Sequence, residues 1–214
     1  VLALEDCPGG TIVTDSVTSS GLKEFINNNL GGVHYRYRRG YKNVIDEAIR
    51  LTAEGQVCPL AIETSGHAAF RNNYFLDDGA YLITRIIIKM AELKSQGKTI
   101  TDLISDLKEP LDKCEIRINI TEADFKAKGN EVIAMLERYS NAKSGWTIAD
   151  DNREGIRVTC SEGNGWFLLR LSVHDPVMPL NIESDSEGGC KIIAKSLLEF
   201  FGSIDGLDIS PLEN

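Results

Sequence analysis

The first half of the chain alternates short apolar runs with longer stretches in which apolar residues recur at helical spacing. Three short runs rich in β-branched or aliphatic residues predict strands: 11–14, 33–37 and 59–63. Helical spacing, ended by glycines, predicts a helix after each strand: 20–32, 42–55 and 77–97. The residues directly after Val1 also resemble a strand. This order predicts a three-layer α/β/α unit with a mostly parallel sheet.

The second half of the chain changes to a period of two. Apolar side chains alternate with polar ones along 114–120, which is typical of a strand buried on one face: Cys114, Ile116, Ile118 and Ile120. Further short strands are expected at 145–151, 155–163, 165–172 and 179–184. The pair Asn164–Gly165 predicts a hairpin turn between two of them.

Two helices are expected around these strands. Thr121 and Asp124 resemble a capping box, and apolar spacing continues from there to about Tyr139. A last helix is expected at 187–201. The second half is therefore predicted to be a smaller α+β unit, an antiparallel sheet with two helices.

A polar segment, 94–113, separates the two patterns. It holds one short helical pattern, with Thr101 as its cap, Pro110 at its end and three residues facing inward: Leu103, Ile104 and Leu107. We place a domain boundary here, which gives domains at 1–107 and 108–214.

Composition narrows the class of protein. With 214 residues, 42% of them hydrophobic, the chain can build packed cores. Its net charge of -9 argues against a duplex nucleic-acid binder. No apolar run approaches the ~20 residues of a membrane span. Five cysteines lie far apart without a CxxC pair, which favours thiols in a reducing cytoplasm over a zinc site. Because it begins with Val1, we expect a piece of a longer protein.

The first candidate site follows the third predicted strand, in "LAIETSGHAAF". Ligands of open α/β sheets bind at the carboxyl ends of strands. Glu63 can accept hydrogen bonds from sugar hydroxyls, Ser65 can donate or accept, and Gly66 lets a backbone approach closely. The structural alternative is a capping turn with a satisfied His67.

The second candidate site is "RLSVHDPVMP". Arg170 offers a planar fork to an oxyanion, Ser172 a hydroxyl, and His174 an imidazole that can charge near neutrality. A loop of this kind also presents backbone N–H groups to a phosphate. The alternative is a surface loop in which Arg170 pairs with an acidic neighbour.

The third candidate site is "YRYRRGYKN", where four cations fall within seven residues of an acidic chain: Arg36, Arg38, Arg39 and Lys42. The local reversal of charge indicates an anion site or, equally, a strand edge protected by charge. The doublet Asp77–Asp78 is interpreted as a helix start and not as a metal loop.

The order of these segments resembles the C-terminal half of an α-D-phosphohexomutase of the phosphomannomutase/phosphoglucomutase family. "IETSGH" resembles the family's sugar loop, Gly-Glu-x-Ser-Gly-His, and "RRGYKNVIDEA" resembles its Val-Gly-x-Lys segment. "LDDGAYLITRII" resembles the stretch after the sugar loop. "RLSVHDPVMPLNIES" resembles the phosphate loop, Arg-x-Ser-(Gly/Asn)-Thr-Glu-Pro.

The resemblance implies an intramolecular phosphotransferase that interconverts hexose 1-phosphates and hexose 6-phosphates. Family members have four domains; the first carries a phosphoserine and the second binds Mg²⁺, and neither motif is in this sequence. The chain would hold the third domain, for sugar recognition, and the fourth, for phosphate binding. Its partners would be the missing N-terminal half and a hexose phosphate, with hexose 1,6-bisphosphate as intermediate. The fragment alone would be inactive.

The resemblance also implies roles for residues of this sequence. Catalytic roles would fall to Lys42 and His67. Substrate-binding residues would be Arg39, Gly40, Glu63, Ser65, Gly66, Arg170, Ser172 and His174.

The chain departs from the family's phosphate loop at several positions. Val173 and His174 replace the small residue and threonine, Asp175 replaces the usual glutamate, and Pro179 stands where many members have a second arginine. Two other readings stay open. One is a stand-alone module that binds sugar phosphates without catalysis, and the other is a pair of structural domains that binds another protein.

Overall fold

The computed structural model describes residues 1–212, which fold into two compact units. Unit 1 comprises Val1–Lys108, and unit 2 begins at Glu109. Each unit has its own sheet and its own hydrophobic core. None of the helices within residues 1–212 is long and apolar enough to cross a membrane.

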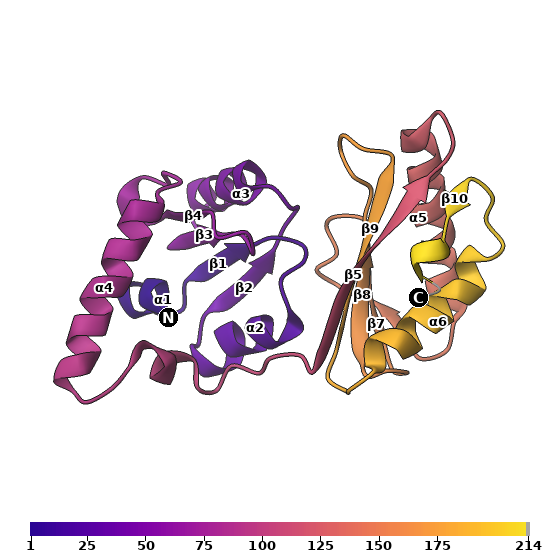
Figure 1. The fold of residues 1–214 in the computed structure, drawn as a ribbon. Helices are drawn as coiled ribbons and strands as arrows, with labels where there is room; N and C mark the ends of the chain where they lie inside the picture. Colours follow the sequence, from indigo (N-terminus) through magenta and orange to yellow (C-terminus); the bar gives the residue numbers. More distant parts are fainter. Residues whose placement is uncertain (213–214) are drawn as a thin grey trace. The chain divides into compact units, whose positions relative to one another are not determined.

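The sheet of unit 1 has four strands in the order β2-β1-β3-β4 (Figure 1). Its strands are β1 (Thr11–Thr14), β2 (Val33–Arg36), β3 (Leu60–Ile62) and β4 (Ala68–Phe70). The first three are parallel, as predicted, and β4 is antiparallel to β3. Sequence analysis missed β4, because three apolar residues directly after a polar turn show no alternation.

Helices cover both faces of this sheet. They are α1 (Leu2–Asp6), α2 (Ser20–Glu24), α3 (Tyr41–Ala53) and α4 (Gly79–Ser95); α2 continues as a π-helical turn, Phe25–Asn29, and a 3₁₀ turn spans Arg71–Asn73. Neighbouring residues of β1 point to opposite sides of the sheet. Ile12 packs in the cluster that contains Ile26, whereas Val13 packs against Val44 of α3. These two cores confirm the three-layer arrangement.

The start of the chain differs from the prediction. Residues Leu2–Asp6 form the helix α1, with Ala3 and Leu4 buried, and not a strand. A five-residue helix is too short for its period to be read from sequence. Tertiary contacts with the core therefore decide its conformation.

Unit 2 is a six-stranded antiparallel sheet in the order β10-β5-β9-β8-β7-β6. Its strands are β5 (Asp112–Ile120), β6 (Trp146–Ile148), β7 (Ile156–Cys160), β8 (Gly165–Leu169), β9 (Val177–Ser184) and β10 (Leu207–Asp208). Two helices, α5 (Phe125–Ala142) and α6 (Gly189–Phe201), cover one face (Figure 1). A short 3₁₀ turn, Ser210–Leu212, follows β10. The α+β prediction is confirmed, apart from the two-residue β10.

The core of unit 2 lies between this sheet and its helices. Ile118 and Ile120 of β5 are fully or almost fully buried, as the alternation predicted, and they pack with Leu136 of α5 and Leu197 of α6. Burial of such side chains contributes roughly 1.5–3 kcal/mol each before the entropy cost of ordering is counted.

Two predicted helix caps are displaced by a few residues. The short helix between the units is a 3₁₀ turn, Ile100–Ile104, capped by Thr99 and Asp102 and not by Thr101, and it ends well before Pro110. Ile104 is exposed and not inward-facing. For α5 the cap is Asp124, whose side chain accepts from Ala127 N at 3.0 Å, and Thr121 lies outside the helix.

Glycines allow the start of α6 to pack closely on the β8–β9 hairpin. A Cβ atom on Gly165 would collide with the backbone oxygen of Glu183 in the neighbouring strand β9 and would crowd the side chain of Ile193 of α6. A Cβ atom on Gly189 would collide with the hydroxyl of Ser184 and the backbone oxygen of Gly163. The first turn of α6 can therefore sit directly on the sheet only if these two positions lack side chains.

Candidate active site

The cluster that follows β3 is the turn of a tight β-hairpin. Glu63 N donates to the backbone oxygen of His67 at 2.9 Å, and Gly66 N donates to that of Glu63 at 3.0 Å. Gly66 has a φ of +97°, which favours glycine. The side chains from Thr64 to His67 are exposed, so the hairpin presents a row of polar groups at the carboxyl end of β3. We call residues 63–67 the hairpin turn.

Glu63 connects the hairpin turn to the start of α3. Its side chain is almost fully buried, and its two oxygens accept from Gly40 N at 2.6 Å and from Ser65 Oγ at 2.9 Å. Gly40 directly precedes α3 with a φ of +116°, again a glycine conformation. Three of the sequence-predicted residues thus lie in one hydrogen-bonded group.

His67 lies between an acid and an aromatic ring. Its Nδ1 is 2.7 Å from Asp77 Oδ2, and its ring stacks on Tyr41 with 5.0 Å between centroids. Sequence analysis assigned Asp77 to a helix start, but Asp78 alone caps α4, by accepting from Tyr81 N at 3.0 Å. Only one of two adjacent acids can be the N-cap. The sequence therefore indicated that the other acid, Asp77, is available for a different contact. Tyr41 had no such signal.

Asp15 braces the hairpin turn from the end of β1. It is fully buried, and its carboxylate accepts from Thr64 Oγ1 at 2.7 Å and from Thr18 Oγ1 at 3.0 Å. Sequence analysis missed this residue. Its position directly after a buried strand was a signal, because the carboxyl ends of neighbouring parallel strands meet at one sheet edge.

The basic segment around β2 is divided between the interior and the solvent. Arg36 is buried and donates to the backbone oxygen of Thr18 at 3.0 Å. Lys42 is 76% exposed, with its Nζ 2.6 Å from Asp46 Oδ2, and this hydrogen bond raises the pKa of Lys42. The backbone oxygen of Arg39 accepts from Asn43 at 2.6 Å. Lys42 is thus held along the helix surface by a neighbour one turn away.

In unit 2, the candidate phosphate loop connects β8 to β9. Ser172 N donates to the backbone oxygen of Val177 at 2.9 Å, which closes the loop. Ser172 Oγ accepts from Asp175 N at 3.3 Å, so the hydroxyl lies inside the turn. Val173, His174 and Asp175 are exposed. The loop therefore offers polar groups to solvent at the end of β8.

Arg170 belongs to a row of residues that crosses three strands. Its backbone N donates to the oxygen of Pro179 at 3.1 Å, and Pro179 pairs with Arg117 of β5. Glu115 accepts from Arg117 Nε at 3.0 Å and from Asn181 Nδ2 at 3.2 Å. Burial opposes ionisation of Glu115, but these hydrogen bonds and the charges of Arg117 and Arg170 outweigh it and lower the pKa. Arg117, which sequence analysis missed, brings a second cation next to Pro179.

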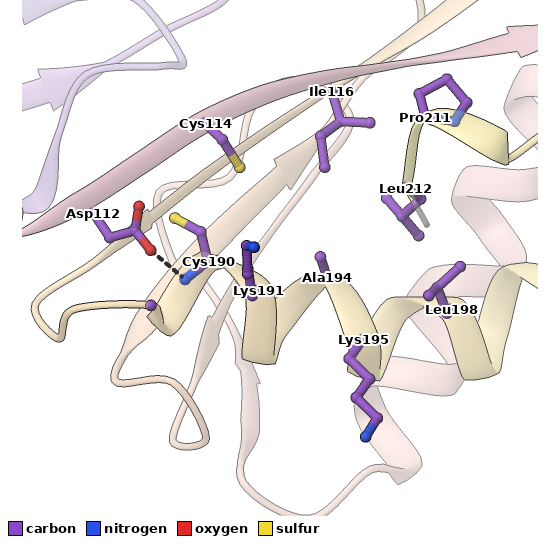
Figure 2. Close-up of a pocket in the computed structure, with 11 residues that line it drawn as sticks. Asp112, Cys114, Ile116, Cys190, Lys191, Ala194, Lys195, Leu198, Pro211 and Leu212 are labelled. Carbon is purple, nitrogen blue, oxygen red and sulfur yellow. Dashed lines mark hydrogen bonds between the residues drawn. The ribbon is translucent and has the colours of Figure 1, made fainter. Parts of the chain in front are cut away.

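A separate pocket of about 650 Å³ lies on the helical side of unit 2, between β5 and α6 (Figure 2). Apolar residues make up much of its wall, including Ile116 and Leu198, and none of the sequence-predicted site residues lines it. The sulfur atoms of Cys114 and Cys190 point toward each other there. Burial raises the pKa of both thiols, which makes them poor nucleophiles.

Within residues 1–212, no group of three or more histidine, cysteine or acidic side chains is arranged to hold a metal ion. The polar groups of the hairpin turn and of the phosphate loop are donors and acceptors suited to hydroxyls and phosphate oxygens.

Comparison with known proteins places this fold in a family. Residues 2–110 match the family model described as "Phosphoglucomutase/phosphomannomutase, alpha/beta/alpha domain III". The chain therefore belongs to the phosphoglucomutase/phosphomannomutase family, and unit 1 corresponds to its third domain.

Relatives extend the likeness beyond unit 1. A phosphomannomutase/phosphoglucomutase of Pseudomonas aeruginosa is 29% identical over 182 residues, which is 84% of this chain and 35% of the relative. A crystal structure of a family protein from Burkholderia thailandensis has a TM-score of 0.71 at 22% identity and covers 94% of this chain and 40% of that one. The chain thus spans little more than a third of the length of these relatives.

One more distant neighbour was solved with ligands. Structures of Aspergillus fumigatus N-acetylphosphoglucosamine mutase contain GlcNAc-6P and magnesium in one case and glucose 1,6-bisphosphate in another. Their TM-scores are 0.52 and 0.53, with identities of 13% and 11%. They cover 89% and 94% of this chain and 38% and 39% of the fungal chains. At this identity they support the fold.

Proposed function

We propose that this chain is the C-terminal part of a phosphohexomutase that interconverts hexose 1-phosphates and hexose 6-phosphates. The observation that carries the proposal is the hydrogen-bonded group of Gly40, Glu63 and Ser65 at the carboxyl end of β3, within a third domain of this family. A buried carboxylate fixed by two donors is a rigid acceptor for sugar hydroxyls.

A phosphoserine outside this chain would give its phosphoryl group to the sugar phosphate and form a hexose 1,6-bisphosphate. The other phosphate would then return to the serine after the sugar turns over. Glu63 and Ser65 would bind hydroxyls that both orientations present, with the Gly66 backbone close to the ring. The protein would contribute mainly positioning and charge stabilisation.

His67 and Lys42 would act on the reacting side of the sugar. Asp77 and Tyr41 hold the His67 ring in one orientation, which suits a group that donates to a phosphate oxygen. Lys42 would have to exchange Asp46 for the substrate, and Arg39 lies in the same segment. An exposed ion pair costs little to break, because such pairs contribute only about 0–1 kcal/mol.

Unit 2 would bind the phosphate that does not react. Arg170 supplies a planar fork, while Ser172, His174 and the backbone of the exposed loop supply further donors. Many family members have a second arginine at the position of Pro179, and Arg117 would supply that second positive charge here.

Magnesium, present in one fungal neighbour, would be held by the missing N-terminal half and would neutralise charge on the transferring phosphoryl group. The five thiols fit a cytoplasmic enzyme.

Substitution of Glu63 in the full-length polypeptide tests the proposal. Glu63→Gln keeps the shape but replaces one acceptor oxygen with a donor, and we expect kcat/KM for glucose 1-phosphate or mannose 1-phosphate to fall by about a hundredfold. Glu54→Gln, on the exposed end of α3, is the matched control and should leave turnover unchanged. Wild-type rates for Glu63→Gln and Glu63→Ala would overturn the role of the hairpin turn.

A parallel experiment addresses the phosphate loop. Arg170→Ala should raise KM more than it lowers kcat, because it removes contacts made throughout the reaction. The 214-residue chain alone should show no turnover. If its gene proves to encode only this chain, and the chain binds hexose phosphates, the function is that of a stand-alone binding module.

A further inference from the structure

Helix α4 has apolar residues on several sides, including the exposed Ile88, and only one side is covered by unit 1. Tyr81 and Leu82 pack into the unit's core, and Leu93 is the one buried residue of the helix. On the same side, ion pairs connect α4 to α1, with 2.6 Å between Arg85 and Asp6 and 2.7 Å between Lys89 and Glu5. These contacts fix which side of α4 faces its own unit.

A second apolar side forms a continuous stripe. Ile83, Ile87 and Met90 fall at positions i, i+4 and i+7, so they lie above one another along the helix. Their side chains are 58%, 59% and 48% exposed. Figure 1 shows α4 next to α1. We call these three residues the α4 stripe.

Such a stripe is unusual for a helix at a protein surface. Surface helices of soluble proteins carry one apolar face and one polar face, whereas helices that are apolar on several sides are normally buried. Anchors at i, i+4 and i+7 are also the pattern by which a helix binds an apolar groove of a partner. The α4 stripe therefore has the pattern of a contact surface.

Three observations favour a covalently linked partner. The relatives are nearly three times as long as this chain, and unit 1 matches a third domain, so two domains precede it in the family. Three half-exposed side chains offer far less than the roughly 800 Å² per partner of a standard independent interface. A contact this small suits domains on one polypeptide, because tethering raises their effective concentration.

A second copy of the chain fits less well. Each copy carries a net charge of -9, so association would bring like charges together for the gain of a small apolar contact.

We propose that the α4 stripe is the docking surface for the preceding part of the full-length polypeptide, and that Ile87 is its central anchor. The inference rests on the proposed function only in placing this chain inside a longer phosphohexomutase. It concerns domain assembly and needs no statement about substrate.

Ile87→Glu tests the proposal, because glutamate keeps helix propensity but cannot be buried without cost. Chymotrypsin cleavage is followed in the full-length polypeptide and in the 214-residue chain. We expect cleavage of the full-length polypeptide to accelerate about tenfold or more, because a docked apolar side chain is lost. The chain alone should change by less than about twofold, because Ile87 is already exposed there. Ile49→Glu, at a similarly exposed isoleucine of α3, is the matched control and should change neither.

Each other outcome would overturn the proposal. Equal cleavage of wild-type and Ile87→Glu full-length polypeptides would mean that nothing docks on the stripe. Equal acceleration in the chain alone would mean that the stripe is covered within this chain. A dimer of the chain that Ile87→Glu dissociates in analytical ultracentrifugation would assign the stripe to a second copy. None of these measurements involves a substrate. Failure of the mutase proposal, tested by the activity of the Glu63 variants, is therefore distinguishable from failure of the docking proposal.

Discussion

The hairpin turn of unit 1 and the phosphate loop of unit 2 are held in different ways. The hairpin turn is braced by three separate elements, through Gly40 before α3, Asp15 after β1 and Asp77 before α4. The phosphate loop is held mainly by its own atoms, with Asp175 N donating to Ser172 Oγ and Val177 N donating to Asp175 O. The one bond from another element is that of Ile120 N of β5, which donates to the backbone oxygen of Pro176 at 2.8 Å. The hairpin turn is thus fixed from several directions, and the phosphate loop largely by its own backbone.

This difference bears on how each segment would bind a ligand. A site whose groups are already fixed loses little entropy when the ligand binds. Such a rigid site can discriminate between similar arrangements of hydroxyl groups. A loop with few bonds to other elements can adjust its backbone around an anion, whose charge attracts donors from many directions. We therefore expect specificity to reside in unit 1 and adaptable binding in unit 2.

Among the substitutions that test this contrast, we expect Asp15→Ala to have the largest effect. The substitution leaves the buried hydroxyl of Thr18 without its acceptor and removes the hydrogen bond to the exposed Thr64, so we expect unit 1 to lose about 3 kcal/mol of unfolding free energy. Urea unfolding followed by circular dichroism measures the loss. Asp46→Ala, on the exposed side of α3, should cost less than about 0.5 kcal/mol. Equal stabilities for the two variants would show that the brace is not structural.

The second prediction concerns the stability of unit 2 at alkaline pH, which depends on the thiol of Cys160. Burial, with a smaller contribution from the charge of Glu162, raises the pKa of Cys160 to about 12. The unfolded thiol ionises near pH ~8.5, so between these values the native state holds a proton that the unfolded state has lost. Stability from this group is therefore complete below pH ~8.5 and falls as pH rises toward 12.

Both tryptophans, Trp146 and Trp166, lie in unit 2, so their fluorescence reports on that unit alone. We expect its urea midpoint to fall between pH 9 and 11 and the slope to be shallower in Cys160→Ala. Identical slopes for the two proteins would contradict the assignment.

The smallest expected effect is that of Ser172→Ala on stability. The hydroxyl makes one hydrogen bond within a solvent-exposed loop, so its loss should cost unit 2 only about 0.5–1 kcal/mol in the same fluorescence assay. Binding of hexose phosphate by the full-length polypeptide should weaken at the same time. A stability loss as large as that of Asp15→Ala in unit 1 would remove the contrast between the two segments.

Sequence periodicity predicted those elements whose burial is regular. The helix α3 and the strand β5 each run long enough for their periods to appear, and both lie where expected. The short elements α1, β4 and β10 have two to five residues, which is less than a readable repeat. Their conformations come from pairing and packing with residues far away in sequence.

For the candidate site, residue types indicated Glu63 and Ser65 but not the residues that hold them. The contact of Asp15 with Thr64 spans 49 positions, and no local pattern encodes which strand ends will meet. Tyr41 and Asp77 reach His67 from two different elements. Such neighbours can be identified only once the strand order is known. Residue types in the sequence therefore indicate the groups that could bind a ligand, but not the residues that hold those groups in place.

The close packing of α6 on the β8–β9 hairpin has a consequence for which substitutions the protein tolerates. A library of all single substitutions, selected for soluble expression, should retain almost nothing except glycine at Gly165 and Gly189, because any side chain there meets backbone or Ser184. Gly188, whose added Cβ atom would meet open space, should tolerate replacement far better despite its positive φ. Sequencing counts, low for replacements at Gly165 and Gly189 and higher at Gly188, would thus record where this helix meets its sheet.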